Sequence, residues 1–98
     1  MDVVDRLQRW YASQCDGDWE HDSGFTIKTI DNPGWMIKLR LSEDPKYNPG
    51  LPDFKVERSA TDWVHVNVRD GTLQVVGGAL NLKEVLSRFL DLVEPSSE

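Results

Sequence analysis

The sequence predicts an α+β domain, with a five-stranded antiparallel meander sheet and an N-terminal and a C-terminal helix packed on one face. Three observations predict this class. Apolar residues recur with helical spacing near both ends of the chain, apolar and polar residues alternate between residues 25 and 76, and short turn signals separate the alternating runs. Short connections favour antiparallel neighbours, and helices must cover the apolar face of such a sheet.

The first helix is predicted over residues 2–14. Asp2 can cap its first turn, and Gly17 can take the left-handed conformation that commonly ends a helix. The apolar residues on one face of this helix are Val3, Val4, Leu7, Trp10 and Tyr11.

The next two alternating runs predict two strands joined as a hairpin. Their apolar positions are Phe25 and Ile27 in the first run and Trp35, Ile37, Leu39 and Leu41 in the second. Between the runs, Asn32-Pro33-Gly34 predicts a type II turn in which Gly34 accepts a positive φ. Because a type II turn splays its flanking strands, we expect a connection longer than two residues.

Residues 42–52 are predicted to form a surface loop, because their three prolines and one glycine cannot sustain ladder or helix hydrogen bonds. A third strand is predicted at residues 54–57, where apolar and charged residues alternate. Residues 59–62 then turn the chain toward a fourth strand.

The fourth and fifth strands form a hairpin whose register the sequence defines. The fourth strand carries Val64, Val66 and Val68 on one face and ends at Asp70-Gly71, a strong signal for a type I′ turn. With that turn, the facing pairs are Arg69 with Thr72, Val68 with Leu73, Asn67 with Gln74 and Val66 with Val75. Apolar residues then oppose apolar residues throughout.

The last helix is predicted to begin at a capping box formed by Asn81 and Glu84, after Gly77-Gly78 has broken the fifth strand. Pro95 ends the helix, and residues 95–98 are expected to fray. Its apolar stripe consists of Leu82, Val85, Leu86, Phe89, Leu90 and Val93.

Length and composition predict a single domain, residues 1–98, that works in the cytoplasm. The chain has one cysteine, no basic and apolar leader, and no apolar run long enough to cross a bilayer. Its 17 acids and 11 bases give a net charge of −6, which disfavours nucleic acid and anionic membranes as partners and favours a basic partner. Solubility alone is the alternative explanation of that charge.

Catalytic and metal sites are not expected. Cys15 lacks a recognisable base, because His21 and His65 stand in no catalytic context. Acids alternate from Asp16 to Asp22 as at the start of a calcium loop, but His21 and Ile27 occupy the positions of the required glycine and glutamate. Zinc would need about four cysteine or histidine ligands, and the chain has fewer. We therefore expect neither enzyme activity nor a cofactor.

Two surfaces remain as candidates for function. The sheet face opposite the valines is predicted to present Lys28, Lys38, Arg40, Lys55, Glu57, His65, Asn67, Arg69 and Gln74. Such a face is commonly a plain solvated surface. The second candidate is the acidic segment, residues 16–22, in which Trp19 either anchors a partner or plugs the edge of the core.

Four tryptophan-rich or glycine-rich groups of residues are spread over nearly the whole chain. They are residues 10–21, Asp31 to Trp35, Glu57-Arg58-Ser59 with Asp62-Trp63, and Gly77-Gly78 with Asn81-Leu82. These segments resemble the immunity protein 53 family of bacterial polymorphic toxin systems. The resemblance implies an α+β protein that binds and neutralises a cognate toxin and needs no catalysis.

The resemblance further implies tight binding, with a nanomolar or lower Kd, which corresponds to about −12 kcal/mol. If the toxin is a nuclease, its basic cleft would attract an acidic inhibitor. The resemblance carries over no contact residues and defines no oligomeric state. The alternative function is a small-molecule-binding or adaptor domain. From charge and aromatic content, the predicted partner-binding residues are Asp16, Asp18, Trp19, Glu20 and Asp22, with Asp62 and Trp63 as neighbours.

Overall fold

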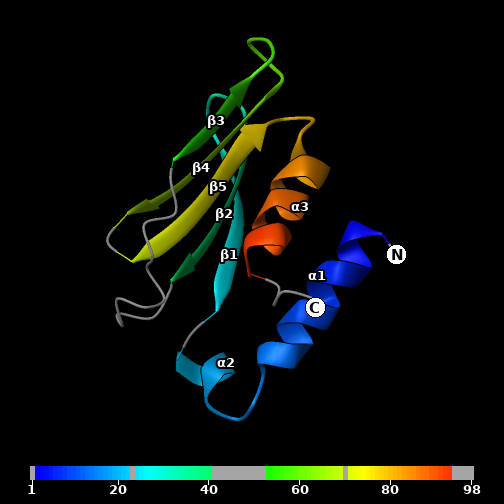
Figure 1. Ribbon diagram of the computed structural model, residues 1–98, viewed down its shortest axis with the longest axis vertical. Coiled ribbons are helices and arrows are strands. Elements are labelled where there is room, and N and C mark those ends of the chain that lie inside the picture. Colours follow the sequence, from blue (N-terminus) through cyan, green and yellow to red (C-terminus); the bar gives the residue numbers. More distant parts are fainter. Residues whose placement is uncertain (1, 23, 41–52, 70, 94–98) are drawn as a thin grey trace.

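A computed structural model describes residues 2–22, 24–40, 53–69 and 71–93 (Figure 1). Its elements are α1 (Val3–Gln14), α2 (Trp19–Asp22), β1 (Phe25–Ile30), β2 (Gly34–Arg40), β3 (Phe54–Glu57), β4 (Trp63–Arg69), β5 (Thr72–Gly78) and α3 (Leu82–Val93). The predicted α+β class is therefore confirmed. The loop predicted at residues 42–52 and the tail at residues 95–98 lie outside the described residues.

The five strands form one antiparallel sheet, but the predicted meander order is wrong. The order is β1-β2-β5-β4-β3, so β5 lies in the centre and β3 at an edge. Each of the other four strands carries charged residues, whereas β5 carries none and buries Leu73 and Val75 almost completely. Burial of apolar surface therefore favours β5 as the central strand. Residues 41–53 connect β2 to the far edge.

Both helices lie on the same side of the sheet, as predicted (Figure 1). The register places Ile37, Val75 and Val66 on the face that α3 covers, and each of these side chains is at most 5% exposed. From α3, Phe89 and Leu90 are fully buried against this face. The core is therefore a single layer between α3 and one face of the sheet.

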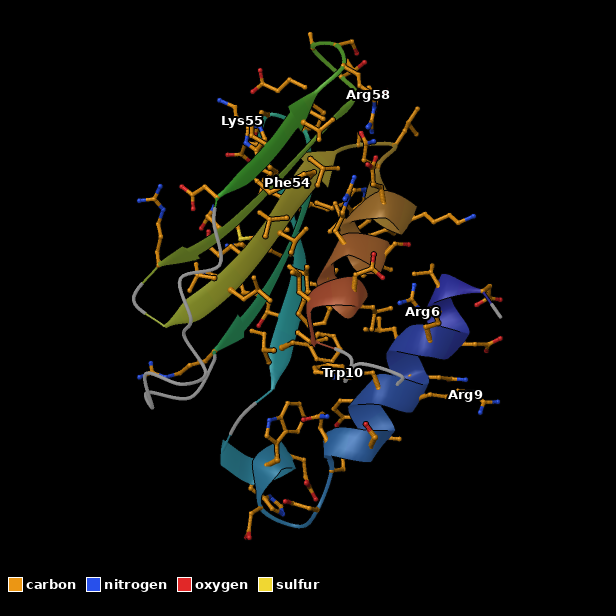
Figure 2. All side chains as sticks on the ribbon, in the orientation of Figure 1. Arg6, Arg9, Trp10, Phe54, Lys55 and Arg58 are labelled. Carbon is orange, nitrogen blue, oxygen red and sulfur yellow. The ribbon has the colours of Figure 1, made fainter. Side chains whose placement is uncertain are left out.

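Helix α1 packs beside α3. Its Trp10 ring lies 5.2 Å from the ring of Phe89 and 5.7 Å from that of Phe25, in centroid distances (Figure 2). On the outer side of the same contact, Arg6 Nη2 lies 3.1 Å from Asp91 Oδ1 of α3. Helix α1 therefore extends the core past the β1 edge of the sheet.

The β4–β5 hairpin has the predicted register. Arg69 faces Thr72, Val68 faces Leu73, Asn67 faces Gln74 and Val66 faces Val75. Gly71 takes the positive φ of 74° that the turn requires, while Asp70 lies outside the described residues. Turn chemistry and apolar alternation thus give the correct pairing.

Two glycine predictions are wrong. Gly34 does not take a positive φ: it begins β2 and pairs with Ile30, so residues 31–33 form the connection, which is longer than two residues as expected. Gly77 and Gly78 do not break β5 but complete it. A Cβ on Gly77 would lie 2.5 Å from Val85 of α3, so this glycine allows the close approach of helix to sheet.

Of the two helix caps predicted from the sequence, the cap of α1 is formed and the capping box of α3 is not. Asp2 caps α1 as predicted, because its Oδ1 accepts the backbone N–H of Asp5 at 2.8 Å. Helix α3 begins after Asn81 as predicted, but the capping box is not formed. The Asn81 amide instead donates to Asp62 Oδ1 at 2.9 Å and to Glu84 Oε1 at 3.2 Å, since both carboxylates need donors.

Replacing Phe89 tests the core. Because this ring is fully buried against Trp10 and Phe25, we expect Phe89→Ala to lower the free energy of unfolding by about 3–5 kcal/mol. Urea denaturation followed by circular dichroism measures the change. The control is Leu80→Ala, because Leu80 is 97% exposed and its loss should change stability by about 0.5 kcal/mol or less. Equal losses in both variants would contradict this account of the core.

Candidate functional site

Two carboxylates of the acidic segment, residues 16–22, accept hydrogen bonds from the backbone of the same segment. Asp16 Oδ1 accepts the backbone N–H groups of Asp18 at 2.9 Å and of Trp19 at 3.0 Å. Glu20 accepts in return from the backbone N–H groups of Asp16 and Gly17, each at 3.0 Å. The N–H groups of Trp19 and Asp18 hold the pKa of Asp16 below its usual range. Asp16 and Glu20 thus close the turn that leads into α2.

Trp19 plugs the edge of the core. Its ring is half-buried and packs edge-on against Trp10 and Tyr11, with centroid distances of 6.0 Å in both pairs. Of the two predicted roles for this tryptophan, the contacts support the structural one. Asp18 is exposed, and no hydrogen bond of its carboxylate is found among the described residues.

Asp62 and Trp63 lie at the other end of the molecule. The acidic segment sits at the α2 end of the longest axis, while residues 58–62 connect β3 to β4 at the opposite end (Figure 1). The predicted partner-binding residues therefore fall into two separate groups. Sequence reasoning placed them together because it could not foresee which ends of the elements meet.

Asp62 belongs to a charged cluster that ties the β3–β4 connection to α3. Arg58 lies 2.9 Å from Asp62 Oδ1 and also pairs with Glu84 at the start of α3 (Figure 2). The Arg58 guanidinium, and after it the amide of Asn81, holds the pKa of Asp62 below its usual range. The two carboxylates, Asp62 first, raise the pKa of Arg58. The cluster thus holds the β3–β4 connection against the start of α3.

The polar sheet face is formed as predicted, and we call it the open face. The register puts all nine predicted residues on the side opposite α3: Lys28, Lys38, Arg40, Lys55, Glu57, His65, Asn67, Arg69 and Gln74. Lys55 of β3 points away from the helices (Figure 2). No described element packs over this face.

A shallow cleft on the open face was not predicted. Its volume is about 440 Å³, and its lining includes Ile30, Trp63, His65 and Asn67. In the register, Ile30 and Trp63 stand in one row across the sheet and are separated by two glycines, so no side chain fills the space between them. The signal was the two glycines, which come from strands that are not consecutive in sequence.

One wall of the cleft is polar. The rings of Trp63 and His65 lie 4.9 Å apart, and His65 Nε2 lies 3.0 Å from Glu57 Oε1. Lys55 Nζ lies 3.3 Å from the same carboxylate oxygen. Lys55 first, and then His65, lowers the pKa of Glu57. This wall can donate hydrogen bonds to a bound group or accept them from it.

The reactive side chains considered in the sequence do not form a site with one another. Cys15 is exposed, and its thiol lies 3.3 Å from the carbonyl oxygen of Tyr11. His65 is paired with Glu57 on the open face. Among the described residues, no group of three or more His, Cys, Asp or Glu side chains is placed to hold a metal ion. Within the same part of the chain, no helix is long and apolar enough to span a membrane.

These features define a small α+β domain with an acidic segment at one end and a shallow cleft on the open face. The model of the immunity protein 53 family matches residues 4–94. The chain therefore belongs to the immunity protein 53 family. No curated protein and no solved structure matches it.

The pH dependence of stability tests the Arg58 cluster. Because the folded pKa of Asp62 is lowered, its charged form stabilises the fold above the ordinary aspartate range, and this contribution is lost as pH falls through the folded pKa. We expect Asp62→Asn to lower Tm at about pH 7 and to differ less from the native chain near about pH 2.5. Thermal melts across this range measure the effect.

Asp18→Asn serves as the control, since it removes an exposed carboxylate and changes the net charge equally. A Tm difference between Asp62→Asn and the native chain that is constant across the whole range would contradict the role of the ionised carboxylate.

Proposed function

We propose that this chain is an immunity protein that binds a cognate bacterial toxin stoichiometrically and neutralises it in the cytoplasm of the producing cell. The observation that carries the proposal is the family match over residues 4–94. Neutralisation requires a surface that binds the toxin tightly and does not require chemistry on the immunity protein. The described residues offer surfaces of the necessary kind.

The size of the chain is compatible with such a role. A specific interface buries about 800 Å² on each partner. The accessible surface of this chain is 6658 Å², so about one-eighth of it would be enough.

The acidic segment and the Asp62–Trp63 pair remain proposed partner-binding residues. Asp16 and Glu20 already bind backbone N–H groups of their own turn, so the exposed Asp18 is the residue that best tests this segment. A toxin with a basic working cleft, such as a nuclease, would be attracted by this charge.

Co-expression tests the function. We expect cells that carry a toxin domain encoded beside this gene to survive when the chain is produced and to die when an empty vector replaces it. The purified pair should co-elute in a fixed ratio with a Kd in the nanomolar range or lower, about −12 kcal/mol. Equal death with and without the chain, for every adjacent toxin candidate, would contradict the proposal.

A second candidate function is small-molecule binding in the cleft. Its volume of about 440 Å³ and its Trp63 and His65 wall favour this function, since ligand pockets commonly fall in this size range. Native mass spectrometry of the purified chain would then show a bound species of fixed mass that Trp63→Ala loses. A native chain that carries no such species, even from a cell extract rich in metabolites, would contradict this candidate.

A further inference from the structure

The charge of the open face has the opposite sign to that of the chain. All charged residues of the five strands lie on this face, because the register turns only uncharged residues toward α3. They are the bases Lys28, Lys38, Arg40, Lys55 and Arg69, the acid Glu57, and His65. Among the described residues, Glu57 is the only acid that lies in a strand. Although the chain has a net charge of −6, its open face is therefore basic.

The open face has the arrangement of an interface, with an apolar centre and a charged rim. One row across the sheet runs Lys28, Met36, Val76, His65, Lys55, so that lysines stand at both edges, with the apolar Met36 and Val76 and the ring of His65 between them. The neighbouring row contributes Ile30 and Trp63 to the cleft. Binding surfaces commonly combine a central anchor pocket, in which tryptophan is enriched, with a polar rim.

A hydrogen-bond acceptor in the cleft lacks a donor. Asn67 Oδ1 is buried and has no hydrogen-bond partner among the described residues. Asn67 lines the cleft beside His65 and Trp63, so rotation of its side chain toward the cleft would let this oxygen accept from a partner's donor. Satisfying a buried acceptor is favourable, since an unpaired one carries a desolvation penalty of about 1–3 kcal/mol.

The charged residues at the rim of the open face favour a partner surface of negative charge. Among the described residues, no carboxylate pairs with Lys28, Lys38 or Arg69, so these three cations can pair with carboxylates of another molecule. Nucleic acid is the less favoured anion, because the whole chain is acidic and Glu57 interrupts the basic face. A protein surface rich in aspartate and glutamate matches the charges of the open face.

We propose that the open face is the main toxin-binding surface, that it docks an acidic patch of the toxin, and that the cleft between Ile30 and Trp63 receives an anchoring side chain. This inference rests on the proposed function and names the surface and partner chemistry that serve it. Figure 1 shows that α1 and α3 both lie on the other face, so neither of these two helices covers the open face.

Charge reversal on the two faces tests the proposal. Lys28→Glu/Lys38→Glu changes the open face, and Arg9→Glu/Lys83→Glu makes the same change in net charge on the helices, where both residues are exposed. The probe is the toxin domain encoded beside this gene, purified as an inactive variant, with binding followed by biolayer interferometry. Thermal melts establish that both variants are folded.

We expect the open-face variant to raise Kd by about tenfold or more, mainly because oppositely charged surfaces no longer attract, and the helix variant to stay within about twofold of the native chain. Added salt should slow association of the native chain and should slow that of the open-face variant less. Trp63→Ala should weaken binding at every salt concentration, since it removes the anchor wall.

The outcomes separate this proposal from the proposed function. If the native chain protects cells and the open-face variant binds as tightly as the native chain, the surface assignment is overturned while the function stands. If Asp18→Lys abolishes binding and the open-face variant does not, the acidic segment is the interface.

If the native chain neither binds nor protects, the function and the surface assignment fall together. If the native chain binds a labelled duplex DNA or RNA tightly through Lys28 and Lys38, and the toxin affinity is unchanged in the variant, the partner chemistry is overturned.

Discussion

The burial of α3 against one face of the sheet is the interaction on which the rest of the structure depends. Phe89 and Leu90 are fully buried there, opposite strand residues such as Ile37 and Val75 that are equally inaccessible. Since α1 also packs on this side, beside α3, the described helices leave the second face of the sheet uncovered (Figure 1). The open face, with its charge and its cleft, is a consequence of this one-sided core.

The fold concentrates the charged residues of the strands on one face, and most of them are bases. Several carboxylates outside the strands bind backbone or side-chain donors nearby: Asp2 caps α1, Asp16 closes the turn before α2, and Asp62 pairs with Arg58. The bases of the strands point to the open face instead. The net charge of the chain therefore does not predict the sign of a particular surface. That sign depends on which face of each helix or strand carries the charged residues.

Local chemistry accounts for the parts that sequence reasoning predicted correctly. The β4–β5 register follows from a two-residue turn and from apolar alternation, and the Asp2 cap and the apolar stripe of α3 depend on neighbours within a few residues. The nine polar residues of the open face follow from the same alternation. The predictions at Gly34 and Gly77 were wrong because the backbone at these positions packs closely against residues that are distant in sequence. Turn propensities describe only neighbouring residues and do not include such contacts.

Taken by itself, the sequence determined the α+β class, α1, α3 and the five strands, the pairing of one hairpin and membership of the immunity protein 53 family, because periodicity, caps and motifs depend on residues close together in the chain. It did not predict the short helix α2. Tertiary structure alone decided the strand order, the separation of the acidic segment from Asp62 and Trp63, and the cleft. Each of these depends on pairing between strands distant in sequence, where burial of the uncharged β5 at the centre outweighs chain proximity.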